Sequence, residues 1–152
     1  MIKRFQINTV GKDYFVGDIH GQFHILLQKM QEVNFNIGFD RIFSVGDLVD
    51  RGKDSELSLL WIKKPFFHAV QGNHENMSIR YPLGNMDTDN YFRNGGGWMI
   101  ALEKDEQLLF SEAFSILPMM IEVETKHGLV GVVHAEVAGD DWDWCKDNIQ
   151  NK

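Results

Sequence analysis

The chain has 152 residues, of which 43% are hydrophobic, 12% aromatic and 24% charged. These values predict one folded domain over residues 1–152 and exclude a disordered chain. The net charge of −7 at pH 7 argues against nucleic acid as a partner. No membrane partner is expected either, because no apolar run approaches the roughly 20 residues of a membrane span. A single cysteine, Cys145, excludes an internal disulfide. Because residues 1–15 contain no apolar stretch typical of a secretory signal, we expect a cytoplasmic protein.

Three short apolar runs predict β-strands, because each is rich in branched or aromatic residues and is closely followed by a glycine. They cover residues 13–16, 41–45 and 66–70. Between the first two runs, apolar side chains recur at helical spacing and predict a helix over residues 22–34 with one buried face. These side chains are Phe23, Leu26, Leu27, Met30 and Val33.

A shorter helix is expected between the second and third strands. Asp54 or Ser55 would cap it. Its inward-facing side chains are expected to be Leu57, Leu60 and Trp61. Because a strand, a loop and a helix repeat in this order, the pattern predicts parallel strands joined by crossover helices, and therefore an α/β fold.

The second half of the chain is less regular. Residues 81–89 are predicted to be a loop or short helices, and a helix is expected over residues 102–117. The glycine run Asn94–Gly97 either permits a close backbone approach or serves as a flexible connector. Residues 119–125 and 129–134 are predicted to be two strands that a glycine-containing turn joins into a hairpin. The tail, residues 136–152, is acidic and has no clear period.

Each of the first three predicted strands is followed by residues that can bind metal ions. The motifs are Gly17-Asp18-Ile19-His20-Gly21, Gly46-Asp47-Leu48-Val49-Asp50-Arg51-Gly52 and Gly72-Asn73-His74-Glu75. Glycine followed by aspartate is common in turns, so one such motif alone would carry little weight. Because the carboxyl ends of parallel strands meet at one edge of a sheet, where α/β proteins bind ligands, the three motifs together predict one shared site.

The side chains at these positions favour a transition metal over Ca²⁺ or Mg²⁺ alone. They form a mixed set of oxygen and nitrogen ligands that suits Mn²⁺, Fe or Zn²⁺. The set consists of Asp18, His20, Asp47, Asn73 and His134. Asp47 is central in the order of the three loops, and its carboxylate can bridge two ions. Two such ions can hold phosphoryl oxygens and share a hydroxide nucleophile.

Neighbouring side chains offer the other functions that phosphate chemistry requires. His74 could protonate a leaving oxygen, and Asp50 could orient that histidine. Arg51 offers a guanidinium fork that matches a phosphate. Trp98 is expected to serve packing rather than function, and the acidic stretch 140–143 is expected to be solvated.

The three motifs resemble the signatures of the metallophosphoesterase superfamily, and more narrowly those of the phosphoprotein phosphatase family of serine/threonine phosphatases. The stretches Asn94–Trp98, Leu117-Pro118 and Val133-His134-Ala135 are similar to the lambda-phage type found in phages and bacteria. The resemblance implies a four-layer α/β sandwich, in which a central β-sandwich is flanked by helices.

The same resemblance implies how the ligands are shared between two divalent metal ions. Asp18, His20 and Asp47 would hold one ion, and Asp47, Asn73 and His134 would hold the other. Mn²⁺ is the expected ion, with Fe or Zn²⁺ as alternatives.

The resemblance further implies that His74 with Asp50 is the acid pair and that Arg51 binds phosphate. The chain departs from the family at Gln71, where the family has an arginine. It also has neither a second phosphate-binding arginine nor the late Gly-His-Thr segment that supplies another ligand to the second ion. A weakened second metal site is therefore expected. The last strands of the second sheet would be missing too, and the exposed edge would invite self-association.

These features predict a metal-dependent serine/threonine protein phosphatase that acts on a phosphorylated protein or a small phosphomonoester. One alternative is a catalytically weak or inactive metal-binding or interaction module, which the missing ligand motivates. Another is a dinucleotide tetraphosphate hydrolase, which shares the three motifs. Glu75, where that group tends to have aspartate, and the Asn94–Gly97 run both favour the phosphatase.

Overall fold

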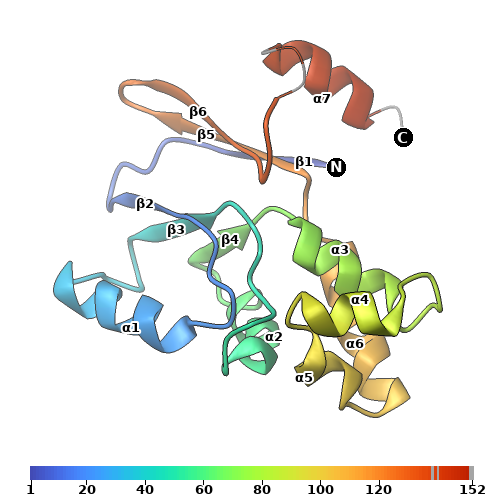
Figure 1. Cartoon of the computed structure of the whole chain (residues 1–152). Coiled ribbons are helices and arrows are strands. Elements are labelled where there is room, and N and C mark those ends of the chain that lie inside the picture. The colour runs from blue at the N-terminus through green and yellow to red at the C-terminus, as the bar shows by residue number, and fades with distance from the viewer. Residues whose placement is uncertain (138, 140, 151–152) are drawn as a thin grey trace.

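The computed structural model describes residues 1–137, 139 and 141–150, and in it two sheets lie face to face (Figure 1). The first sheet has the order β1–β5–β6, formed by Ile2–Phe5, Met120–Thr125 and Gly128–Val132. The second has the order β2–β3–β4, formed by Asp13–Val16, Arg41–Ser44 and Phe67–Ala69. The strands of the second sheet match the three predicted apolar runs to within one residue at each end.

Strand directions follow the prediction in both sheets. The β2–β3–β4 sheet is parallel, and its register places Val16 beside Ser44 and Ser44 beside Ala69, so the three strands end at one edge. In the other sheet, β5 and β6 form the expected antiparallel hairpin, and β1 runs parallel to β5. The sequence pattern does not predict β1, because Lys3 and Arg4 interrupt its apolar residues.

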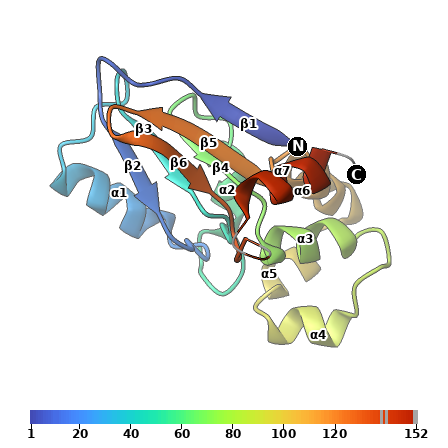
Figure 2. The ribbon, with the colours of Figure 1, turned by 90° about the horizontal axis from the view of Figure 1, so that it is seen from above.

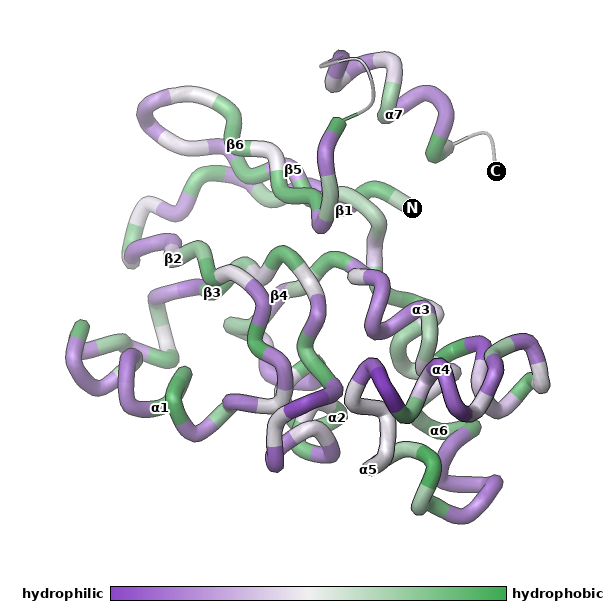
Figure 3. Tube along the Cα trace, viewed as in Figure 1, coloured by the Kyte–Doolittle hydropathy of each residue, from purple (hydrophilic) through white to green (hydrophobic). Residues whose placement is uncertain are grey.

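Apolar side chains fill the space between the two sheets. The buried cluster consists of Phe43, Val70, Ile121, Val123 and Val132. Figure 3 shows apolar stretches in green along strands of both sheets. Because burying a side chain of this size contributes about 1.5–3 kcal/mol, this cluster is what holds the two sheets together.

Two helices cover the opposite face of the β2–β3–β4 sheet (Figure 1). They are α1 (Phe23–Glu32) and α2 (Ser58–Trp61), and a 3₁₀ turn over Ser55–Leu57 precedes α2. The rings of Phe23 and Trp61 stack with 5.2 Å between their centroids, which joins the two helices. Trp61 also packs edge-on against Phe67 of β4 at 5.3 Å.

The outer face of the β1–β5–β6 sheet is covered by α7 (Trp142–Gln150). The ring of Trp142 lies so close to Gly131 that a Cβ at this glycine would come within 2.4 Å of it. The indole N–H of Trp142 donates to Glu122 of β5 at 2.8 Å. Helix, sheet, sheet and helix thus form four layers, which confirms the predicted α/β sandwich.

Four further helices gather to one side of the sheets (Figures 1 and 2). They are α3 (Asn73–Arg80), α4 (Thr88–Arg93), α5 (Gly97–Ile100) and α6 (Lys104–Ser115). The last matches the predicted helix 102–117 with two residues fewer at each end. Ser111 of α6 donates to the carbonyl of Ile79 in α3 at 3.0 Å, which ties these two helices together.

The predicted cap and inner face of the helix at α2 are wrong. Asp54 does not cap that helix; its carboxylate accepts from the backbone N–H and the ring of His24 at the start of α1, at 3.0 and 2.7 Å. Leu57 and Leu60 are exposed, and of the three predicted inward residues only Trp61 is buried. The reason is geometric: a 3₁₀ turn followed by a single α-turn does not hold one helical period.

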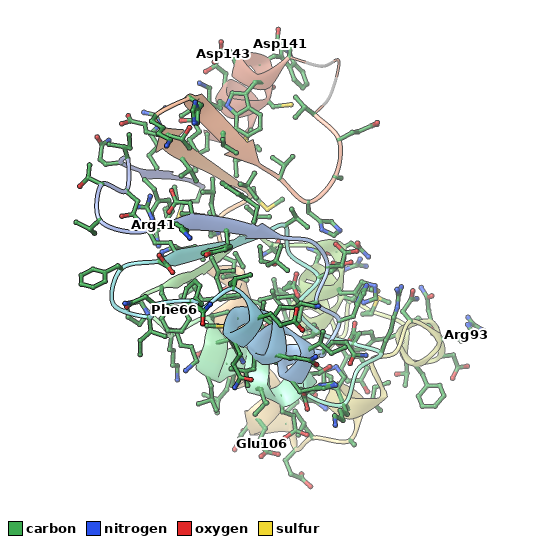
Figure 4. The ribbon with its side chains drawn as sticks, turned by 90° about the vertical axis from the view of Figure 1, so that its left-hand side faces the viewer. Arg41, Phe66, Arg93, Glu106, Asp141 and Asp143 are labelled. Carbon is green, nitrogen blue, oxygen red and sulfur yellow. The ribbon has the colours of Figure 1, made fainter. Side chains whose placement is uncertain are left out.

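The tail is also more regular than its sequence pattern predicts, because residues 142–150 form α7. Its partly buried residues Trp142, Cys145 and Ile149 share one face, but acidic residues around them obscure the period. Asp141 and Asp143 point outward from the top of α7 (Figure 4), as expected for a solvated stretch. Asp140 lies outside the described residues. Among the residues that the structure describes, no helix is long and apolar enough to cross a membrane.

Candidate metal centre

The three metal-binding motifs follow β2, β3 and β4, and backbone hydrogen bonds join them at the edge where these strands end. The N–H groups of Ile19 and His20 both donate to the carbonyl of Asp47, at 3.0 and 2.8 Å. The N–H of Gly21 donates to the carbonyl of Leu48 at 2.8 Å. The loop after β2 is therefore held against the loop after β3, as the shared site requires.

Glu75 joins the third motif to the second, a function that sequence reasoning missed. Its fully buried carboxylate accepts the backbone N–H groups of Asp47, Leu48 and Gly72, each at 2.8 Å. Burial raises the pKa of Glu75, while these N–H groups act to lower it. Glu75 is the third residue of α3, where a carboxylate often reaches back to the helix start, and this position was the available signal.

The backbone of the site is strained. His20, Asp47, Asp50 and Arg51 have positive φ angles of 44°, 49°, 69° and 69°. For residues other than glycine this conformation costs on the order of 1–3 kcal/mol each, and such residues cluster at functional sites. Glycine would adopt the same angles at less cost. The presence of other residue types at these four positions is therefore explained by their side chains and not by the backbone.

His20 is oriented as a metal ligand beside two carboxylates. Its Nδ1 lies 3.0 Å from the carbonyl oxygen of Val49, which can only accept, so Nδ1 carries the hydrogen. This leaves the lone pair on Nε2, which lies 3.8 Å from an oxygen of Asp18 and 3.8 Å from Oδ2 of Asp47. A backbone carbonyl that fixes the tautomer is a common feature around metal-binding histidines.

His134 is held in the same way on the other side of Asp47. Its Nδ1 donates to the carbonyl of Val45 at 2.9 Å, and its Nε2 lies 3.4 Å from Oδ1 of Asp47. The same Nε2 lies 2.8 Å from Oδ1 of Asn73. Because the hydrogen of His134 is on Nδ1, its Nε2 and the Oδ1 of Asn73 are both acceptors. A cation bound between these two atoms would stabilise the arrangement.

The five predicted ligands thus come together around Asp47. The ligand atoms form two sets, and within each set they lie within 4.8 Å of one another. The first set comes from His20, Asp47 and His74, and the second from Asp18, Asp47 and His134. Both sets share Asp47, whose two oxygens face different histidines. Carboxylate, imidazole and amide ligands suit divalent transition metals, so the residues present fit a pair of such ions.

His74 and Asp50 form a buried pair beside this cluster. Nδ1 of His74 lies 2.7 Å from Oδ2 of Asp50, and Nε2 lies 3.8 Å from Oδ2 of Asp47. Both side chains of the pair are almost completely buried. The backbone N–H of His74 also donates to Oδ1 of Asp47 at 3.0 Å, so the first turn of α3 orients both groups.

The guanidinium group of Arg51 spans the two histidines. Its Nη1 lies 3.1 Å from Nε2 of His20, and its Nη2 lies 3.2 Å from Nε2 of His74. The fork therefore faces the same space as the predicted metal ligands and the predicted acid. This is where an anionic group bound to the metal ions would meet it.

The glycine run supports Arg51 by a close backbone approach, which is the first of the two predicted alternatives. The N–H of Arg51 donates to the carbonyl of Gly95 at 3.2 Å. Gly95 has a φ of +96°, and a Cβ there would lie 2.5 Å from the backbone nitrogen of Arg51. Only glycine satisfies both conditions.

Gln71, the departure from the family pattern, contacts α6. Its side-chain amide donates to the carbonyl of Phe114 at 3.0 Å, and its backbone N–H donates to the carbonyl of Pro118 at 2.8 Å. The side-chain amide of Gln71 is therefore hydrogen-bonded to the C-terminal end of α6. A cavity of about 360 Å³ lies beside it and reaches the cluster at Asn73 and His134.

A family model described as calcineurin-like phosphoesterase matches residues 14–151. Serine/threonine-protein phosphatase 1 of Salmonella typhimurium is 33% identical over 136 residues, which are 88% of this chain and 62% of that protein. The symmetrical bis(5'-nucleosyl)-tetraphosphatase of a Shewanella species is 44% identical over 64 residues, which are 41% of this chain and 23% of that protein.

Among solved structures, one assigned provisionally as a diadenosine tetraphosphatase is similar with a TM-score of 0.60 and 25% identity. The match covers 80% of this chain and 49% of that one. This chain thus spans 62% of the length of the Salmonella phosphatase and about half of the solved structure.

Proposed function

The chain belongs to the calcineurin-like phosphoesterase family, and on this basis we propose that it hydrolyses phosphate monoesters with the aid of two divalent metal ions. The observation that carries the proposal is the position of Asp47. Its Oδ2 lies 3.8 Å from Nε2 of His20, and its Oδ1 lies 3.4 Å from Nε2 of His134. A carboxylate between two such histidines is suited to bridge two ions.

One ion would be held by Asp18, His20 and Asp47, and the other by Asp47, Asn73 and His134. When bound, such ions polarise a phosphoryl oxygen and lower the pKa of water. The first set offers two carboxylates and the second only one, so the second ion should bind more weakly. We propose Mn²⁺ as the native ion, with Fe or Zn²⁺ as alternatives that suit the same ligands.

The side chains around the metal ligands have separate tasks in this proposal. Arg51 binds the non-bridging oxygens of the phosphate through its fork. His74 gives a proton from Nε2 to the leaving oxygen, and Asp50, 2.7 Å from its Nδ1, keeps the ring in the required orientation. Proton donation of this kind typically contributes a factor of about 10²–10⁴ in rate.

The proposed substrate class is phosphorylated serine or threonine in proteins. The match to the Salmonella serine/threonine phosphatase extends over 88% of this chain, whereas the match to the Shewanella tetraphosphatase extends over 41%. The first match therefore covers most of this chain and the second less than half of it.

A dinucleotide tetraphosphatase is the second function that we consider. The observation that favours it is the solved structure with a TM-score of 0.60 over 80% of this chain. Both functions would use the same metal ligands, so only the substrate separates them.

The test compares three substrates in excess Mn²⁺: p-nitrophenyl phosphate, a phosphoserine peptide and diadenosine tetraphosphate. The expected result is turnover of the first two, lost in Asp47→Asn. Turnover of the tetraphosphate alone would favour the second function. Metal binding without turnover of any substrate would refute both and indicate a non-catalytic metal-binding module.

A further inference from the structure

The carboxylate of Asp50 has more partners than the acid pair requires. One oxygen, Oδ2, faces Nδ1 of His74. The other, Oδ1, accepts the indole N–H of Trp98 at 2.7 Å and the hydroxyl of Tyr91 at 3.2 Å. Asp50 and Tyr91 are completely buried, so water does not compete for these bonds.

Tyr91 is itself held in place by the helix that carries His74. The hydroxyl oxygen of Ser78 lies 2.7 Å from that of Tyr91 and 3.0 Å from the carbonyl oxygen of His74. When the Tyr91 hydroxyl donates to Asp50, the single hydrogen of Ser78 is donated to Tyr91. Burial, with the adjacent Asp50 carboxylate, raises the pKa of Tyr91, so its hydroxyl keeps its proton and can donate.

The glycine run brings these donors to Asp50. A Cβ at Gly96 would come within 2.3 Å of the ring of Tyr91, so only glycine allows the turn between α4 and α5 to pass over that ring. Trp98 follows two residues later, in the first turn of α5. The short helices α4 and α5 thus place two neutral donors on one buried carboxylate.

We propose that Trp98 and Tyr91 are positioning residues for proton donation by His74, an inference that rests on the proposed function. A carboxylate bound on one oxygen alone can rotate about its Cβ–Cγ bond. The two donors on Oδ1 prevent this rotation and keep Oδ2 aimed at Nδ1 of His74. The imidazole is then held with Nε2 toward the leaving oxygen.

This arrangement serves one chemical step, the transfer of the phosphoryl group to water. A water oxygen bonds to phosphorus while the bond from phosphorus to the leaving oxygen breaks. The leaving oxygen takes the proton from Nε2 of His74. The water keeps one hydrogen in the product phosphate, and its other proton passes to Nε2 of His74.

The test uses substrates that need the proton to different extents. p-Nitrophenolate leaves readily without a proton, whereas the alkoxide of a phosphoserine peptide does not. Trp98→Phe and Tyr91→Phe each remove one donor and keep an aromatic ring. Either variant should lower kcat for the phosphoserine peptide by about tenfold or more, change kcat for p-nitrophenyl phosphate by less than about threefold, and leave KM unchanged.

Trp61→Phe and Tyr14→Phe make the same substitutions away from Asp50. They should not change kcat for one substrate more than for the other. A second measurement needs no metal: the ¹H NMR signal of the His74 Nδ1 proton, identified by its loss in His74→Asn. It should shift or broaden in Trp98→Phe but not in Trp61→Phe. If Trp98→Phe does not fold, Tyr91→Phe carries the test.

Equal losses on both substrates would show a merely structural role and overturn the inference, as would full activity with an unchanged proton signal. A wild-type chain that hydrolyses neither ester would instead refute the proposed function, and the inference with it.

Discussion

Replacing Glu75 with glutamine should weaken both the fold and the metal centre. The substitution keeps the shape of the side chain but removes its charge and one acceptor oxygen. A glutamine oxygen at the position of Oε2 could still accept from Asp47 and Gly72. Its NH₂ group would then face the N–H of Leu48, which now donates to Oε1 at 2.8 Å, and that donor would be left unpaired.

The size of the effect follows from these contacts. Leaving one buried donor unpaired costs about 1–3 kcal/mol, and weakening the other two bonds adds about 1 kcal/mol. Burial raises the pKa of Glu75, so removing the charge returns part of this cost. We expect the free energy of unfolding to fall by about 2–3 kcal/mol. Because Asp47 would be shared by both ions of the proposed centre, the affinity for Mn²⁺ should fall by about tenfold or more.

Urea unfolding and calorimetric titration with Mn²⁺ measure the two effects. Glu112→Gln, on the exposed surface of α6, is the matched control and should change neither quantity. If Glu75→Gln unfolds within about 0.5 kcal/mol of the wild type and binds Mn²⁺ equally well, the reasoning is wrong.

Three further predictions concern the rest of the fold. Burial, with Lys3 and Arg41, lowers the pKa of His68 from 6.5 to about 4, so the unfolded chain takes up a proton first as pH falls between these values. The free energy of unfolding should therefore decrease over this range by about 1–2 kcal/mol, after allowance for partial exposure. His68→Phe should remove this contribution and make the slope in urea unfolding shallower, and an unchanged slope would contradict the assignment. Gly96→Ala should have a melting temperature well below that of Gly97→Ala. A Cβ at position 96 would meet the ring of Tyr91 at 2.3 Å, whereas a Cβ at position 97 would meet Phe92 at 3.3 Å. Equal melting temperatures of the two variants would refute this reasoning. Among the described strands β6 pairs only with β5, so we expect concentration-dependent self-association through its free edge in sedimentation velocity, and one monomeric species at every concentration would exclude it.

The sequence predicted the sheet that carries the site because its signals are local. Each strand is a short apolar run, and each metal-binding motif follows directly with a glycine. Parallel order then brings Asp18, Asp47 and Asn73 to one edge without any knowledge of the tertiary structure. The roles of these residues as metal ligands stay predictions until metal binding is measured.

The residues that support the site could not be predicted in the same way. Tyr91 and Trp98 lie 41 and 48 positions from Asp50 in the chain, and nothing in their local pattern separates a hydrogen-bonding side chain from one that only packs. The prediction that Trp98 serves packing rather than function missed its bond to Asp50. The helix α3 is equally hidden, because its first turn is made of the polar residues of the third motif.

Calorimetric titration with Mn²⁺ of the wild type, Asp18→Asn and Asp47→Asn tests the bridging role of Asp47 most directly. We predict two sites of unequal affinity in the wild type, weakening of one site in Asp18→Asn, and weakening of both in Asp47→Asn. If Asp47→Asn weakens only one site, or if the wild type binds two ions equally tightly, Asp47 does not bridge a strong and a weak site, and the proposed centre is wrong.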